Sequence, residues 1–534
     1  MPGLTEVASG RFVLNVGSNV AYAVLNVALM TWYIPFLVRH LGVDAYGIIP
    51  LSNTLVMYAA IVSASLDTSI NRFLAIEVNR ANITGANQVF NAALALSLAG
   101  CCVLAVPALA VALLFPVLFE VPPGLAHESS ILFAAAALTT LLAILSGNFG
   151  IASIVTHRFD LRNAVRGATS IARFGLVAVL FALAPASLYH VAAGFVLSAC
   201  IGLIGDFWIW RRLMPELRLG YRYVERAKVR AMMSLGGWSM VNQTGFLLLM
   251  QIDLILVNRF FGANGTGRYG SLMLFPALIY TLAEPVIAVL SPAIMTRYAV
   301  GDQAGLLRLV STSVKLLGLG LALPVGLLCG FGGPILRLWL GPDFAELDGL
   351  VILLVGHLTI SLAARPIAYL LTAYNRVKLQ GMMTLALGLA NIGLAIALVR
   401  WAGWGMAGVA AAGAIVWLFR NFAFLSTYSA VVADQRWWAF YPPLLAGAVC
   451  TAGIGLAGKL VVQWWQPAAW VSLAAWATGF TVAYGIVVYV VGLSRSDHEL
   501  LRTILRRPGA AARSGVAVAG RAPIRWRALN RRRS

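Results

Sequence analysis

Charged residues are scarce in this sequence of 534 residues. Only 11% of the residues are charged, while 60% are hydrophobic, whereas an ordinary soluble domain has roughly 25% charged residues. A water-soluble chain of this length would need far more polar surface. The composition therefore excludes a string of soluble domains and favours a membrane protein.

The motifs of metal, nucleotide and nucleic-acid binding are also missing. None of the cysteines has CxxC or metal spacing, and each lies in an apolar run, so we expect them to be packing residues: Cys101, Cys102, Cys200, Cys329 and Cys450. The glycine-rich stretches show no phosphate-loop pattern. The net charge of +20 comes with no aromatic-basic face or zinc spacing. We therefore expect no metal, no other cofactor, no ATP hydrolysis by this chain and no nucleic-acid partner.

Long apolar runs are what the sequence has in abundance. Runs of about 18 residues or more are long enough to cross hydrocarbon as helices, and these do not alternate apolar and polar residues as barrel strands would. Backbone groups in hydrocarbon must pair within their own segment, which again favours helices. The sequence predicts an all-α polytopic membrane protein with about fourteen transmembrane helices, at 12–38, 48–66, 89–118, 130–154, 168–184, 188–210, 234–260, 270–295, 311–332, 348–373, 379–399, 405–430, 441–462 and 468–492. The stretch 67–88 is too polar to span and is expected to lie at the interface.

The distribution of basic residues orients these spans. With the N-terminus in the cytoplasm, and with residues within about one turn of a span end counted with the adjoining loop, 30 of the 39 Lys and Arg residues fall in cytoplasmic segments. Six fall outside and three lie deeper within spans. This bias is the one that the positive-inside rule predicts. Both termini are therefore expected in the cytoplasm. The tail 494–534 carries eleven Arg residues and is expected to hold the chain to anionic lipid; a docking tail for a synthase partner is the alternative.

A weak internal repeat divides the chain into two lobes. The first predicted span ends in Arg39-His-Leu-Gly42, followed by Tyr46-Gly47, and the seventh ends in Arg259-Phe-Phe-Gly262, followed by Tyr269-Gly270. Six spans separate the copies, so both halves cross the membrane in the same sense, which predicts a parallel repeat around a cavity. The sequence therefore predicts five parts: an N-lobe at 1–210, a basic linker at 211–233, a C-lobe at 234–430, two extra spans at 431–493 and the tail at 494–534.

Several segments resemble one known family. They are LGVDAYG at 41–47, SLDTSINR at 65–72, DLILVNRFFGANGTGRYG at 253–270, LSP at 290–292, ILRLWLGPDFAE at 335–346 and GWGMAGVAAA at 403–412. In this order the chain resembles the polysaccharide flippases, the Wzx-like branch of the MOP (MATE-like) superfamily. The resemblance implies two six-helix lobes, alternating access, and a lipid-diphosphate-linked oligosaccharide as cargo, with no catalytic signature.

Ionisable residues inside spans are the candidate site residues. A charge at the bilayer centre costs roughly 2.5–3.5 kcal/mol on insertion scales, so such residues usually face a wet cavity or each other. Glu284, before Pro285, is a candidate cavity carboxylate, and a structural ion pair is the alternative. Arg365 and Arg173 are the candidate cations for a diphosphate, because a guanidinium binds phosphate oxygens in a fork geometry. Arg420 is expected instead to snorkel or to pair with a neighbouring helix.

A polar stripe is predicted along the seventh span. Asn242 and Asp253 are eleven residues apart, about three helical turns, and so share a face with Gln243 near it. We expect this stripe to face the lumen; interhelical hydrogen bonds are the alternative. Gly245 is not expected to begin a small-residue packing face, because Leu249 fills the next turn. Asp67 is expected to cap the polar segment that follows it.

Three functions remain open from the sequence. The first is a flippase of a bacterial cytoplasmic (inner) membrane that moves a lipid-linked oligosaccharide for cell-surface polysaccharide synthesis, in contact with membrane lipids and polymerase or synthase partners. The second is a cation-coupled MATE-type exporter of small amphipathic compounds, which would favour acids over arginines in its cavity. The third is a membrane glycosyltransferase or polymerase, for which the short outside segments lack paired acids.

Overall fold

Helices make up almost all of the described chain. The computed structural model describes residues 3–492, without the side chains of residues 3–13, 16, 60, 62–65, 68, 79, 234–242 and 491–492. Within that part of the chain there is no strand. The first half contains α1 (Gly3–Leu41), α2 (Val43–Asn79), α3 (Ile83–Leu118), α4 (Ala126–Val155), α5 (Phe159–Leu183), α6 (Leu188–Leu213), a 3-10 turn η1 (Tyr221–Tyr223) and the long α7 (Arg226–Leu272).

The second half has more interrupted helices. It contains α8 (Leu274–Val300), α9 (Gln303–Trp339), η2 (Pro342–Leu347), α10 (Asp348–Val355), α11 (Leu358–Ala363), α12 (Arg365–Ala373), α13 (Val377–Arg400), α14 (Met406–Leu418), the π-helical η3 (Phe419–Leu425), α15 (Ser426–Val432), α16 (Tyr441–Trp464), α17 (Trp470–Val487) and the π-helical η4 (Val488–Gly492). One span is thus built from α10, α11 and α12, and another from α14, η3 and α15.

The number of spans agrees with the sequence prediction to within a few helices. Twelve stretches of the described residues are long and apolar enough to cross a membrane. One of these, Gln243–Val300, contains both α8 and most of α7, and α2 is a further 37-residue helix outside the twelve. The prediction of an all-α polytopic membrane protein is confirmed, with fourteen as an approximate count. The segment 67–88, expected at the interface, is helical: it continues α2 to Asn79 and contains the start of α3 at Ile83.

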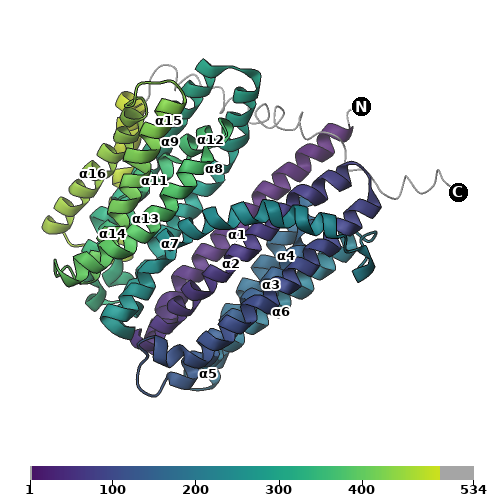
Figure 1. Cartoon of the computed structure of the whole chain (residues 1–534). Helices are drawn as coiled ribbons and strands as arrows, with labels where there is room; N and C mark the ends of the chain where they lie inside the picture. The colour runs from purple at the N-terminus through teal and green to yellow at the C-terminus, as the bar shows by residue number, and fades with distance from the viewer. Residues whose placement is uncertain (1–2, 493–534) are drawn as a thin grey trace.

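The helices form two bundles that α7 connects (Figure 1). The N-lobe consists of α1–α6, and the C-lobe of the helices from α8 onward with the later part of α7. We call the end with the turns at Gly42, Glu120 and Gly262 the Gly42 end, and the end with the turns at Arg80, His157 and Gly301 the basic end. In Figure 1 the bundles diverge toward the basic end.

The two copies of the repeat have the same backbone geometry. Gly42 has φ 81° and ψ 162°, and Gly262 has φ 66° and ψ −163°. These left-handed values favour glycine, which has no Cβ to clash, and a new helical segment starts directly after each one. Tyr46 and Tyr269, which follow the two breaks, are both buried.

The apolar core joins the lobes at the Gly42 end. The largest cluster of buried residues combines Tyr33, Leu37 and Ile48 of the N-lobe with Tyr269 and many C-lobe residues. At the basic end the N-lobe has a separate core, in which the rings of Phe90 and Trp210 stack with centroids 5.2 Å apart.

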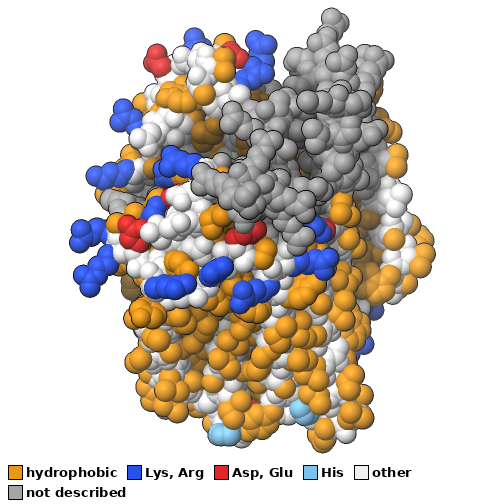
Figure 2. Space-filling view, turned by 90° about the vertical axis from the view of Figure 1, so that its right-hand side faces the viewer, with side chains coloured by type: hydrophobic (Ala, Val, Ile, Leu, Met, Phe, Trp, Pro, Cys, Tyr) orange, Lys and Arg blue, Asp and Glu red, His pale blue; other side chains and the backbone are white. Residues whose placement is uncertain are grey.

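The outer surface has the pattern of a membrane-spanning protein. Figure 2 shows a row of Lys and Arg side chains above a broad hydrophobic band. Trp437 and Trp438 before α16, and Trp464 and Trp465 at its other end, are all exposed. Tryptophan is enriched at both membrane–water interfaces, so one pair at each end of α16 is typical of a helix that spans the membrane.

Candidate functional site

Breaks in the C-lobe helices position two arginines within the bundle. Arg365 begins α12, directly after the break at Ala364, and Pro366 follows it. Proline has no backbone N–H and fits the first turn of a helix, so the sequence Arg-Pro starts a new helix in mid-span. Discontinuous helices of this kind form the substrate and ion sites of many transporters.

Arg420 lies in the other irregular span. It is the second residue of the π-helical segment η3, between α14 and α15. Insertions of this type occur most often at functional sites, because they turn a side chain away from the regular helical position. Arg420 Nε donates to Thr384 Oγ1 (3.0 Å), Nη1 donates to Asn421 Oδ1 (2.8 Å), and its guanidinium lies 5.5 Å from the Trp417 ring centroid.

Arg365 and Arg420 belong to one charged cluster with Glu284. Arg365 Nη2 donates to Glu284 Oε1 over 3.2 Å, and its guanidinium lies 5.7 Å from the centroid of the Phe246 ring. Electrostatic interactions link Arg365 with Arg420, and both arginines with Tyr280. The cluster therefore gathers side chains from α7, α8, α12, α13 and η3.

This cluster carries a net positive charge, and two of its side chains are partly exposed. Two guanidinium groups face one carboxylate, and the side chains of Arg365 and Glu284 are 33% and 50% exposed. A half-exposed ion pair is weak, so Arg365 can exchange Glu284 for a stronger acceptor. Phosphate oxygens are such acceptors for a guanidinium. Sequence reasoning selected Arg365 and Glu284; Arg420 was expected to pair with a neighbouring helix, which the bond to Thr384 of α13 agrees with.

Asp253 lies in a second polar site on the same lobe. Tyr269 Oη donates to Asp253 Oδ2 over 3.0 Å, while Oδ1 is buried without a hydrogen-bond partner. Asn391 of α13 is fully buried beside this carboxylate and interacts with it, although no hydrogen bond of good geometry joins the two side chains. Buried polar atoms without a well-formed hydrogen bond are rare in a folded protein. Asp253, Tyr269 and Asn391 thus form a small buried polar site.

The remaining predicted residues lie elsewhere. Arg173 stays within the N-lobe, where its guanidinium covers the Phe195 ring at 3.9 Å from the centroid, and it interacts with Tyr33 of α1. Gln243 is half-buried. The side chain of Asn242 lies outside the described residues. The polar stripe expected to face the lumen is thus seen only at Asp253, where it faces α13 and α14.

An N-lobe cluster was missed by sequence reasoning. Ser146 of α4 donates to Asp206 Oδ2 (2.7 Å). Asp67 of α2 lies against Gly147, the next residue of α4. Arg162 of α5 interacts with both carboxylates. Asp67 caps no helix, because α2 continues through it, so that expectation is wrong. The sequence offered one indication of this cluster: Asp67 and Asp206 are acids at the edge of predicted spans of this lobe.

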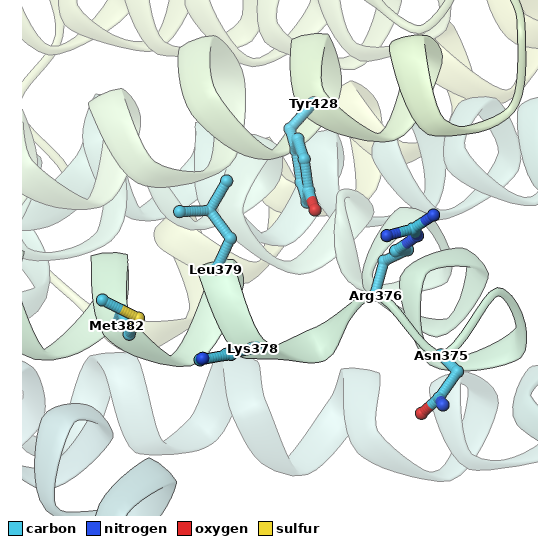
Figure 3. A pocket seen from close by; sticks show the side chains of 6 residues that line it. All are labelled: Asn375, Arg376, Lys378, Leu379, Met382 and Tyr428. Carbon is cyan, nitrogen blue, oxygen red and sulfur yellow. The ribbon is translucent and has the colours of Figure 1, made fainter.

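A pocket of about 390 Å³ lies at the basic end of the C-lobe, where α13 begins. Its lining residues are Asn375, Arg376, Lys378, Leu379, Met382 and Tyr428. Figure 3 shows the Tyr428 ring directed into the space between Leu379 and Arg376, while Asn375 and Lys378 turn away. The two positive charges do not converge there, so this pocket is not a built anion site.

Two helical lobes with a charged cluster at broken helices form an arrangement that also occurs in membrane transport proteins. Similar solved structures include "Lipid II flippase MurJ, inward closed conformation" (TM-score 0.60, 12% identity, covering 83% of this chain and 98% of that one). Another is the inward-facing conformation of a multidrug resistance MATE family transporter of the MOP superfamily (TM-score 0.58, 16% identity, covering 82% and 99%). At these identities the likeness concerns the fold.

The family follows from the sequence match. Residues 36–347 match the family described as "Polysaccharide biosynthesis protein", and the chain belongs to this family. It is also 29% identical over 502 residues to "Uncharacterized membrane protein EpsK" of Bacillus subtilis (strain 168), which covers 93% of this chain and 98% of that protein. The predicted resemblance is confirmed at two levels: the family is one of polysaccharide biosynthesis, and the fold is similar to those of MurJ and of MATE transporters of the MOP superfamily.

Proposed function

We propose that this protein is a flippase that carries a polyprenyl-diphosphate-linked oligosaccharide from the cytoplasmic to the outer leaflet of a bacterial inner membrane. The observation that carries the proposal is the paired arginine cluster of the C-lobe, in which Arg365 and Arg420 exceed Glu284 by one charge. The family, whose description is polysaccharide biosynthesis, supports the glycan as cargo. In this proposal both chain termini lie on the cytoplasmic side.

The chemistry of the cluster suits a diphosphate head group. A guanidinium offers parallel N–H donors that match two phosphate oxygens, and Tyr280 and Tyr369 add hydroxyl groups that already interact with Arg365. On binding, the diphosphate would take the place of Glu284 at Arg365. On release, Glu284 would take Arg365 back, so that the arginine is not left unpaired in the bilayer.

Asp253 is the better candidate for coupling to an ion gradient. Glu284 already has a cationic partner, whereas the buried carboxylate of Asp253 has only the neutral side chains of Tyr269 and Asn391 beside it. A proton or a sodium ion would satisfy this carboxylate, and the membrane potential supplies about 2.3 kcal/mol per charge per 100 mV. The same observation favours the second candidate function, a cation-coupled exporter of small amphipathic compounds. Such an exporter has no need for two adjacent arginines at the cluster.

The test measures on which side lipid-linked oligosaccharide lies in cells depleted of the protein. Labelled polyprenyl-diphosphate glycan is exposed to an enzyme that acts only outside. We expect the glycan in depleted cells to be protected from this enzyme. The wild-type chain should make the glycan accessible to the enzyme again, and Arg365→Ala should not. Arg400→Ala is the matched control, because this exposed arginine of the same lobe stacks only on Phe260.

Other outcomes separate the alternatives. Normal sidedness together with raised drug sensitivity would reject the glycan and favour the exporter. Glycan that is exported but stays unpolymerised would favour a membrane polymerase or glycosyltransferase.

A further inference from the structure

A large groove lies at the basic end of the N-lobe, away from the charged cluster. Its volume is about 1120 Å³. Its lining residues come from about one turn of α3 and from the beginning of α7 with Val224 just before it: Ala95, Leu96, Ala99, Val224, Arg226, Ala227, Val229, Arg230 and Met233. One wall is therefore apolar and belongs to a span, and the other carries two arginines.

The start of α7 is fastened to the N-lobe by the opposite side of the helix. Lys228 Nζ pairs with Glu77 of α2 over 2.8 Å, and the Met232 carbonyl accepts from Ser69 Oγ over 3.2 Å. Met232 is buried in the N-lobe core. Because residues 228 and 232 hold this helix down, Arg226 and Arg230, one turn apart, remain on its other side and border the groove.

The linker before α7 is held just as firmly. Asn87 of α3 donates to the Glu216 carbonyl and accepts from the Arg218 N–H (2.6 Å). Asn91, one turn later, bonds the Arg218 carbonyl (2.8 Å) and the Gly220 N–H (2.9 Å). The groove is therefore a fixed part of the N-lobe rather than a gap beside a loop.

Charge decides what can occupy the groove. Arg226 and Arg230 are exposed and form no ion pair with any described residue. The segment 211–233 holds seven basic residues and only two acids, Glu216 and Glu225. The tail 494–534, with eleven Arg residues, is repelled by this charge. The occupant must be anionic.

The apolar wall continues into the bilayer. From Ala99 an exposed stripe runs along α3 at helical spacing through Val103, Val106, Leu113 and Val117. α3 is also the most apolar of the candidate spans. The occupant therefore needs an anionic head and a long apolar tail that can lie along this stripe.

We propose that the groove binds an anionic glycerophospholipid of the surrounding bilayer. Its phosphate lies between Arg226 and Arg230, and its acyl chains follow the exposed stripe of α3. Basic pockets beside spans bind anionic lipid head groups in this way. The site lies within one lobe, so a bound lipid travels with the N-lobe and anchors that lobe at the membrane surface. This proposal is independent of the cargo.

The test is native mass spectrometry of the full-length protein in detergent, titrated with dioleoylphosphatidylglycerol. The variant is Arg226→Gln/Arg230→Gln. The control is Arg218→Gln/Arg222→Gln, which removes the same charge from the same segment. The control leaves the bonds of residue 218 in place, since they use its backbone, and Arg222 stacks only on its neighbour Tyr223.

The groove variant is expected to bind phosphatidylglycerol at least about tenfold more weakly than the wild type, because a hydrogen bond to a charged group contributes about that factor. The control is expected to stay within about threefold. Equal loss in both variants would reduce the effect to general surface charge and overturn the proposal. A polyprenyl diphosphate that binds while phosphatidylglycerol does not would assign the groove to a different lipid, and would also overturn it.

A second variant tests the apolar wall without changing charge. Ala99→Trp fills the groove from α3 and is expected to lower phosphatidylglycerol binding while both arginines remain. If Ala99→Trp binds this lipid as the wild type does, the proposed position of the acyl chains is wrong. Size-exclusion chromatography of each variant shows whether it is folded.

Discussion

The two ends of the interface between the lobes are built differently. At the Gly42 end, α2 and the helical segment 263–272 approach so closely that a Cβ on Gly47 would lie 2.6 Å from the Ala263 carbonyl oxygen and 2.7 Å from the Gly267 nitrogen. Gly267 meets the Val43 carbonyl oxygen in the same way, and Gly270 meets Pro50. Side chains add to this closure, since Asp44 accepts from Asn264 Nδ2 over 2.6 Å.

The basic end has no such contact among the described residues. Among the described residues, all hydrogen bonds between the lobes lie within about three helical turns of the Gly42 end. The two farthest from that end are Thr54–Gln251 and Trp339–Thr31. Beyond them, α1 exposes Val20 and Val24, and α8 exposes most of its side chains from Leu282 onward.

In the proposed function, this difference would make the Gly42 end the closed gate. Small residues let the two backbones approach closely there, and the side chains of the shared apolar core pack beside them. The repeat places one of these two backbone segments in each lobe. The charged cluster lies near the middle of α8, at Glu284, between the Gly42 end and the basic end.

The largest expected effect comes from Gly47→Leu. The added side chain would meet the backbone of the segment 263–272, and overpacking of this kind costs about 3 kcal/mol or more, which is about a hundredfold in the equilibrium between closed and open gate. We expect the Gly42 end to stay open and transport to be lost. The measurement is labelling of Ala45→Cys, a position 6% exposed here, by an impermeant thiol reagent added outside, in a background without the five native cysteines.

Gly17→Leu is the matched control. Gly17 lies in α1 toward the basic end, and no atom of the described residues lies within 4 Å of a Cβ added there. We expect little labelling of Ala45→Cys in this variant and normal transport. Equal labelling in both variants would show that the two ends do not differ in the way described.

Arg365→Gln and Glu284→Gln should act in opposite directions on cargo binding. Without Arg365 the cluster loses a donor, and Glu284 is left unpaired and repels a diphosphate. We expect about tenfold weaker binding of a polyprenyl-diphosphate oligosaccharide, measured by native mass spectrometry. Without Glu284 the two arginines are free, so binding should be equal or tighter while release slows. Weaker binding in both variants would mean that the ion pair only supports the fold.

A smaller effect is expected from Asn258→Ala at the Gly42 end. Asn258, which is buried, accepts from the Glu120 N–H (3.0 Å) and donates to the Glu120 carbonyl (3.1 Å) across the interface. Loss of both bonds should weaken the closed gate by roughly 1–3 kcal/mol, seen as intermediate labelling of Ala45→Cys. Glu120→Gln removes only the exposed pair with Arg259 and should change labelling less.

Features of the fold and of the candidate site could be predicted from the sequence where a single helix contains all the residues that indicate them. The repeat at Gly42 and Gly262 was visible because a glycine that ends a helix needs no partner to be recognised. Arg365 was visible because a charge followed by proline is rare within an apolar run. Each of these features depends on local chemistry, which a single sequence contains.

Prediction from the sequence failed where a feature is formed by residues from two different helices. Gly245 was rejected as a packing residue because Leu249 follows it, yet a Cβ there would lie 2.9 Å from the Leu385 nitrogen of α13. Gly388 on α13 is the second small residue of that contact, and its own Cβ would lie 3.3 Å from the Gly245 carbonyl oxygen. The small-residue face is thus split between two spans. The cluster of Asp67, Asp206 and Arg162 was missed for the same reason.

The smallest expected effect concerns the ion pair that holds the start of α7 at the basic end. The hydrogen bond from Lys228 holds the pKa of Glu77, in the part of α2 beyond the span, below its ordinary value of 4.5. A lowered pKa in the folded state stabilises the fold above the ordinary pKa, and this stability is lost as the pH falls through the lowered value. Lys228→Met should therefore reduce stability at pH 7, by about 1 kcal/mol. The difference from the wild type should shrink as the pH falls below the ordinary pKa of Glu77 and vanish once this carboxylate is protonated in the folded state.

Thermal unfolding followed by intrinsic fluorescence between pH 3 and pH 8 measures this difference, with Arg222→Met as the control for loss of one charge in the same segment. A constant difference across that range would mean that Lys228 acts through packing of its aliphatic chain. The pair would then contribute nothing to the attachment of α7, and the attachment would rest on Met232 and the bond from Ser69. The basic end would in that case be held, like the Gly42 end, by packing and backbone contact rather than by charge.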